Sequence, residues 1–366
     1  MSISIPENKK ISPFLVFFVV QKMQFGIGIL GFQRIIAKNA GHDAWISIIL
    51  VGIGVHIVLW ALFKMLETVN GDMISIHTFV FGKIVSKIFG IFFILYYLLL
   101  TVTVIRTYVE IIQVWMFTDL ATFWFSLVLL SVVVYIIFGG FRTVTGMAFF
   151  GIVLPFYVFA LFLFTLPYAE FNNLLPILDH SISDILLGSK NMSLTVLGFE
   201  SLLIFYPFIK DPKKSKKWAH LAVFSTTMIC LYLAILTFAY FPENQLQKNI
   251  WPTLTMWKII MMPFVERFEY IGIANWCLII LPNASIALWC SSRIVKRLFS
   301  IKQRTTVPIL AIICLIATSF LFTRKQVNLL SDMVGQVGFY LNFIYFPLLL
   351  VATLIAKKVK KNEVGS

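Results

Sequence analysis

The sequence predicts an all-α integral membrane protein with ten transmembrane helices. These form two inverted repeats of five, and helices 1 and 6 are unwound near their middle. Hydrophobic residues make up 60% of the 366 residues and charged residues only 13%, which is far more apolar than a soluble domain. The apolar residues come in blocks of about 20, the length that crosses a bilayer as a helix. Glycines interrupt the first block of each half.

The expected spans divide into two halves of five, residues 12–166 and 192–356, within a single domain of residues 1–366. An odd number of spans per half makes the second half enter the membrane from the opposite side, so the repeats are inverted. The ten spans are residues 12–33, 44–64, 88–115, 121–138, 145–166, 192–209, 219–241, 270–292, 306–323 and 334–356.

The net charge of +14 is distributed as in a membrane protein, not as in a nucleic-acid-binding protein. With the N-terminus in the cytoplasm, 20 Lys and Arg residues fall on the inner side and 8 on the outer side. This bias predicts that both termini are cytoplasmic. The lysine-rich loop at residues 210–217 fits an orientation signal near anionic lipid. Docking of a cytosolic partner is the alternative for that loop.

Catalytic and metal-binding patterns are missing from the sequence. The four cysteines all fall in predicted spans without metal-ligand spacing, and the five histidines form no cluster. We therefore expect no enzyme activity, no metal and no cofactor. His56, in the middle of the second span, fits an interhelical hydrogen bond better than a proton relay.

Two glycine-interrupted segments occupy matching places in the two halves. The first span contains QFGIGIL and the sixth contains LGFES. Unwinding there would free backbone N–H groups for an anionic group and carbonyls for a cation, which suits a zwitterion. Close packing of helices is the alternative explanation for these glycines. The residues expected to bind a ligand in these segments are Gln24, Phe25, Gly26, Ile27, Gly28, Gly198 and Phe199.

Two further polar residues belong to this expected ligand-binding set. Glu200 lies within the sixth span, where a carboxylate must face a cavity, a partner or a proton. It can bind a ligand ammonium, carry a proton or cap the broken backbone. Asn283 follows Pro282 in the middle of the eighth span. It either hydrogen-bonds a ligand or satisfies the carbonyl that the proline frees.

Other features predict supporting structure. Arg106 and Glu110 are four residues apart and share a helix face, which predicts a structural ion pair. Residues 167–191 and 242–269 are long for outer connections, and each holds a short apolar stretch. We expect helices across the outer mouth, either as a lid or as ordinary interfacial helices.

The chain resembles the endospore germination permeases, the B subunits of nutrient germinant receptors within the amino acid–polyamine–organocation superfamily. The resemblance covers nearly the whole chain, through the order and spacing of GIGIL, AGHDAW, RTYVE, NNLLPIL, GFE, PFIKDPKKSKK, WPTL and ERFE. It implies a LeuT-like fold and a place in the spore inner membrane. It also implies a complex with a large A subunit and a lipoprotein C subunit. In one departure, Gln33 stands where many members have a proline.

The expected function is therefore a membrane subunit that senses a small nutrient, often an amino acid, and triggers spore germination. A proton- or cation-coupled amino acid transporter would use the same fold and site. A scaffold subunit with a relict pocket is a further alternative. The apolar neighbours of the glycines suggest a small, partly hydrophobic ligand without identifying it.

Overall fold

The computed structural model describes residues 5–260 and 266–365. The regular structure of the described residues is helical, and their one extended pairing is an isolated parallel bridge between Ile11 and Ile209. The helices of the first half are α1 (Leu15–Gln24), α2 (Phe32–Ala40), α3 (Ala44–Val69), α4 (Met73–Trp115), α5 (Thr122–Phe138), α6 (Phe141–Val153) and α7 (Tyr157–Leu161). The remaining helices are α8 (Ile182–Asn191), α9 (Ser193–Val196), α10 (Leu202–Phe205), α11 (Pro212–Tyr240), α12 (Glu243–Lys248), α13 (Pro252–Trp257), α14 (Phe268–Phe299), α15 (Gln303–Ser319), α16 (Arg324–Tyr340) and α17 (Phe346–Gly365).

Six helical stretches of the described chain are long and apolar enough to cross a membrane. They are Phe32–Val69, Met73–Trp115, Phe141–Tyr168, Pro212–Tyr240, Phe268–Phe299 and Arg324–Asn362. Four shorter apolar helices accompany them: Leu15–Gln24, Thr122–Phe138, Phe199–Phe208 and Gln303–Ser319. Each predicted span overlaps one of these ten stretches, but the count of ten crossings remains a prediction.

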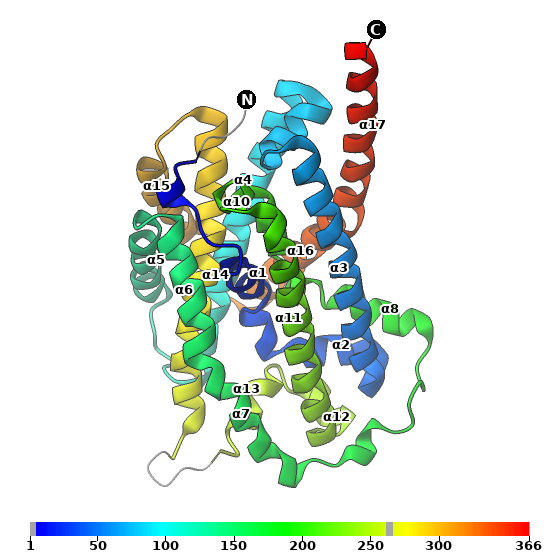
Figure 1. Ribbon diagram of the computed structural model, residues 1–366. Coiled ribbons are helices and arrows are strands. Elements are labelled where there is room, and N and C mark those ends of the chain that lie inside the picture. The colour runs from blue at the N-terminus through cyan, green and yellow to red at the C-terminus, as the bar shows by residue number, and fades with distance from the viewer. Residues whose placement is uncertain (1–4, 261–265, 366) are drawn as a thin grey trace.

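The long helices run side by side, and both termini lie at the same end of the molecule (Figure 1). Large apolar side chains point outward from them, including Ile84, Trp124 and Leu348, which are 79%, 66% and 63% exposed. Lipid, unlike water, favours apolar side chains on the outside of a helix bundle.

The interhelical contact predicted for His56 is present. Nδ1 of His56 on α3 lies 2.8 Å from Nδ1 of His220 on α11. The predicted interhelical hydrogen bond of His56 is therefore confirmed.

Two helices are interrupted, as the glycines predict. α1 ends at Gln24, and Phe25 and Gly26 leave helical geometry before a short 3-10 turn, η2 (Ile27–Leu30), leads to α2. We call residues 15–40 the first broken helix. α9 ends before Leu197, which is extended, and Gly198, which has a φ of 102°; η7 (Phe199–Ser201) and α10 follow. We call residues 193–208 the second broken helix.

The two expected outer segments differ from a simple surface lid. α8 packs against α2 and α3 and keeps most of its residues partly or fully exposed. α12 and α13 lie at the end opposite the termini (Figure 1). The side chains of Thr253, Leu254 and Trp257 in α13 are fully buried, so this helix is part of the interior. Residues 261–265 of the second segment lie outside the described residues.

Candidate functional site

The first broken helix needs glycine because other elements approach its backbone closely. A Cβ atom on Gly26 would lie 2.6 Å from Nδ2 of Asn283 on α14. A Cβ atom on Gly28 would lie 2.9 Å from Oγ1 of Thr195 on the second broken helix. Both distances are shorter than a carbon atom tolerates. Unwinding and close packing, which the sequence left as alternatives, therefore occur together.

The second broken helix needs Gly198 for its conformation and for its packing. The φ of 102° is in the left-handed region, where a side chain costs energy. A Cβ atom there would also lie 2.7 Å from Cβ of Met23 and 2.9 Å from the Met23 carbonyl oxygen. The two breaks thus face each other. The Gln24 side chain joins them, since its Nε2 donates a hydrogen bond of 3.1 Å to the Val196 carbonyl.

Glu200 is fully buried and caps the second break. Its Oε2 accepts a hydrogen bond of 2.8 Å from the N–H of Gly198. Its Oε1 accepts one of 2.7 Å from the Tyr96 hydroxyl on α4. Each carboxylate oxygen therefore has a donor from the protein. Of the three roles open for Glu200, this geometry matches the cap of the broken backbone.

A small cavity of about 40 Å³ lies between the breaks. Six of the predicted residues line it: Gln24, Gly26, Ile27, Gly28, Gly198 and Asn283. Phe25, Phe199 and Glu200 are buried but do not line it. A cavity of this size holds water molecules but no amino acid. This conformation is therefore closed.

Two buried amide oxygens at the cavity lack a partner. Oε1 of Gln24 and Oδ1 of Asn283 make no hydrogen bond in the described chain, although their side chains are only 3% and 4% exposed. A buried acceptor without a donor is unfavourable by about 1–3 kcal/mol. The cavity thus presents two acceptors that a ligand carrying N–H or O–H groups can satisfy.

Lys22 is a buried charged residue for which the sequence suggested no role. It lies two residues before the end of α1 and is fully buried. Its Nζ donates a hydrogen bond of 2.9 Å to the Gly151 carbonyl on α6 and lies 5.7 Å from the centre of the Phe25 ring. The sequence signal was a lysine within a predicted span, but its hydrogen-bond acceptor comes from a segment about 130 residues away.

Two sequence expectations near the site require correction or extension. The predicted partner of Glu110 is corrected: its Oε1 lies 2.8 Å from NH1 of Arg324 at the start of α16. Arg106 is still close enough to Glu110 for their charges to interact, but its Nε donates to the Leu321 carbonyl at 2.8 Å. Gln33, where relatives of the resembled family often have proline, donates to Oγ1 of Thr253 at 2.8 Å. It therefore ties α2 to the buried helix α13.

The fold is similar to that of solved LeuT-fold transporters. Mhp1, a nucleobase-cation-symport-1 family transporter in a closed conformation with bromovinylhydantoin bound, aligns with a TM-score of 0.61 and 13% identity, over 96% of this chain and 91% of Mhp1. MhsT in complex with L-phenylalanine aligns with a TM-score of 0.59 and 13% identity, over 93% of this chain and 98% of MhsT. At this identity the likeness establishes the fold alone.

The sequence itself is similar to spore germination proteins. A family model described as "Spore germination protein" matches residues 10–327. The spore germination protein GerQB of Bacillus cereus is 43% identical over 345 residues, which cover 94% of this chain and 96% of GerQB. The resemblance that the motifs indicated is confirmed. This chain belongs to the spore germination protein family.

Proposed function

We propose that the chain is the germinant-sensing membrane subunit of a spore nutrient receptor. It binds a small nutrient, such as an amino acid, between the two broken helices, and binding triggers germination. One observation carries the proposal: Gln24 and Asn283 hold unpartnered, buried amide oxygens at a cavity between the two breaks. Membership of the spore germination protein family supplies the biological setting.

The chemistry of the breaks suits an amino acid. The two amide oxygens accept hydrogen bonds from an ammonium group. The first N–H groups of η2 and the last carbonyls of α1 have no partner within their own helical segments. These N–H groups favour a carboxylate and these carbonyls favour a cation. Ile27 supplies an apolar wall. Glu200 acts in this scheme as a positioning residue, because it fixes the break rather than the ligand.

The closed cavity implies a second conformation. At about 40 Å³ it is too small for an amino acid, so the breaks must separate for entry. A ligand that binds the open or expanded form better than the closed form shifts the population toward it. A scaffold subunit with a relict pocket also has a filled cavity, but it does not need unpartnered acceptors there.

The proposed setting completes the function. The chain crosses the spore inner membrane ten times, with both termini in the cytoplasm, as the 20 to 8 distribution of Lys and Arg favours. It assembles with the A and C subunits of the receptor and passes the population shift to them. No catalytic step is part of this scheme.

The proposal is tested by germination of spores that carry Asn283→Ala, with Asn275→Ala as the matched control. Both residues lie on α14, but Asn275 bonds its own helix through the Ile271 carbonyl. Loss of one acceptor for a charged donor reduces affinity by about tenfold or more. We expect the half-saturating germinant concentration to rise by that factor in Asn283→Ala only, at equal receptor levels on a blot.

Gly26→Ala provides an independent variant, because the new methyl group would lie 2.6 Å from Nδ2 of Asn283 and displace that side chain. It should also raise the half-saturating concentration. If both variants assemble normally and respond like the parent chain, the cavity does not hold germinant. The chain is then better explained as a scaffold subunit with a relict pocket.

Lys22 favours a second candidate function, a proton-coupled amino acid transporter. An amine that is fully buried beside the first break and holds one hydrogen bond can exchange a proton when the breaks move. The test is uptake of labelled amino acids by the purified chain in liposomes without other subunits. Uptake driven by a proton gradient and abolished by Lys22→Met would support transport. If the chain shows no uptake while Asn283→Ala still alters germination, the results support sensing without transport.

A further inference from the structure

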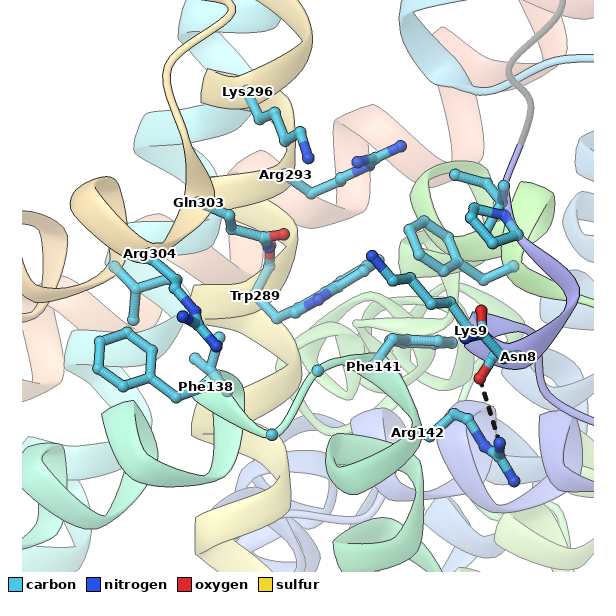
Figure 2. A pocket seen from close by; sticks show the side chains of 17 residues that line it. Asn8, Lys9, Phe138, Phe141, Arg142, Trp289, Arg293, Lys296, Gln303 and Arg304 are labelled. Atoms are coloured by element: carbon cyan, nitrogen blue, oxygen red, sulfur yellow. Dashed lines mark hydrogen bonds between the residues drawn. The ribbon is translucent and has the colours of Figure 1, made fainter.

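A second and much larger cavity, of about 550 Å³, opens at the end of the molecule where the termini lie. It is built by the N-terminal segment, the junction of α5 and α6, the end of α14 and the start of α15 (Figure 2). It shares no lining residue with the small cavity between the breaks. We call it the basic pocket.

Five cationic side chains and no carboxylate line the basic pocket. They are Lys9, Arg142, Arg293, Lys296 and Arg304. None of the five forms an ion pair with a carboxylate of the described residues. Of the nearby acids, Glu7 pairs with Lys10. Asp72 pairs with Arg297 at 2.7 Å and also attracts Arg293 without forming an ion pair with it.

Like charges around one concave surface repel each other unless an anion joins them. The apolar residues between these cations, such as Phe141 and Trp289, strengthen the field inside. Apart from the attraction of Asp72 for Arg293, no carboxylate of the described chain offsets this repulsion within the pocket.

An aromatic floor lies in the pocket and holds one of these charges, that of Arg293. The ring centres of Phe141 and Trp289 are 4.3 Å apart, and the ring centre of Phe208 is 5.1 Å from that of Trp289. The Arg293 guanidinium lies 4.9 Å from the centre of the Phe208 ring and is only 7% exposed. Figure 2 shows the cationic side chains arranged around Trp289. A rigid floor with a buried arginine distinguishes this pocket from a solvated basic surface.

Apolar residues also line the pocket, and one of them reaches the outer surface. They include Ile137, Phe138 and Val307, and Phe138 is 44% exposed. Arginine and lysine together are typical of phosphate sites, the first as a planar fork and the second as a point charge. Basic pockets between transmembrane helices at the cytoplasmic side are typical sites for phosphorylated lipid headgroups.

We propose that the basic pocket binds a phosphate-bearing anion. The shared chemistry is a phosphate group held by the five cations above the aromatic floor. The phosphate comes from the headgroup of an anionic phospholipid, whose chains contact the apolar lining residues, or from a soluble phosphate compound. The site is separate from the proposed germinant site and does not depend on it.

The test measures binding to the purified full chain in detergent. Phosphatidylglycerol and the zwitterionic phosphatidylcholine are compared by native mass spectrometry. Radiolabelled glycerol phosphate and inorganic phosphate are compared by equilibrium dialysis. The variant is Lys296→Gln with Arg304→Gln, both exposed residues whose replacement leaves the core intact. Lys302→Gln is the matched control, since it lies in the same loop but does not line the pocket.

We expect saturable binding of phosphatidylglycerol or of a soluble phosphate, weakened at least about tenfold in the double variant and unchanged in Lys302→Gln. Binding of phosphatidylglycerol without the soluble probes assigns a lipid source; equal binding of glycerol phosphate assigns a soluble source. The proposal is overturned if no phosphate-bearing probe binds saturably, or if Lys302→Gln weakens binding as much as the double variant. Binding of polyglutamate in place of every phosphate probe would also overturn it and indicate an acidic protein partner.

Discussion

Replacing Gly198 by alanine tests whether the second break is built around this glycine. Its φ of 102° costs a residue with a side chain about 1–2 kcal/mol. The new Cβ would lie 2.7 Å from Cβ of Met23 and 2.9 Å from the Met23 carbonyl oxygen, and such overpacking costs about 1–3 kcal/mol. The backbone oxygen cannot rotate away as a side-chain end can. Together these effects should destabilise the fold by about 2–5 kcal/mol.

The assay is thermal unfolding of the purified chain in detergent, with Gly146→Ala as the matched control. Gly146 lies within α6, and a Cβ atom there would meet nothing within 4 Å. Alanine in a helix interior is favoured over glycine by about 1 kcal/mol. Gly198→Ala should lower Tm by several degrees, whereas Gly146→Ala should leave Tm unchanged or raise it. Equal Tm values for the two variants would refute this account of the break.

Two further predictions concern buried polar contacts. Tyr96→Phe removes the hydroxyl that donates to the buried carboxylate at the second break and should cost about 1.5–3 kcal/mol in thermal or denaturant unfolding; the adjacent Tyr97→Phe leaves that hydrogen bond in place and should cost less. In double-mutant cycles, Glu110→Gln should couple to Arg324→Gln by roughly 1–3 kcal/mol. A larger coupling to Arg106→Gln would restore the ion pair expected from the sequence.

The positions of the breaks could be predicted because they depend on local properties of the chain. A glycine within an apolar block marks either a break or a close contact, and both follow from the lack of a side chain. Gly198 meets both conditions, with a left-handed φ and Met23 against its Cα. The matching place of Gly26 in the first half followed from the repeat, again without knowledge of any contact.

The partners of charged groups could not be predicted, because they come from distant segments. The spacing of Arg106 and Glu110 places them on one helix face, but the spacing rule considers only that helix. Arg324 begins a helix more than 200 residues later, and its guanidinium forms the close ion pair with Glu110. Glu200 shows the same limit. The sequence allowed its capping of the nearby backbone, but the donor to its other oxygen is the hydroxyl of Tyr96, about 100 residues earlier.

The helix α14 lines both cavities, so its position affects the two together. It presents Asn283 to the small cavity and, about two and three turns later, Trp289 and Arg293 to the basic pocket. Helical hydrogen bonds along this stretch resist stretching, so a shift of α14 that widens the small cavity also moves the aromatic floor. Occupation of either cavity in only one position of α14 must then alter the affinity of the other by the same factor, since linkage is reciprocal. The absence of any such effect between germinant and phosphate would mean that α14 stays fixed while the broken helices move.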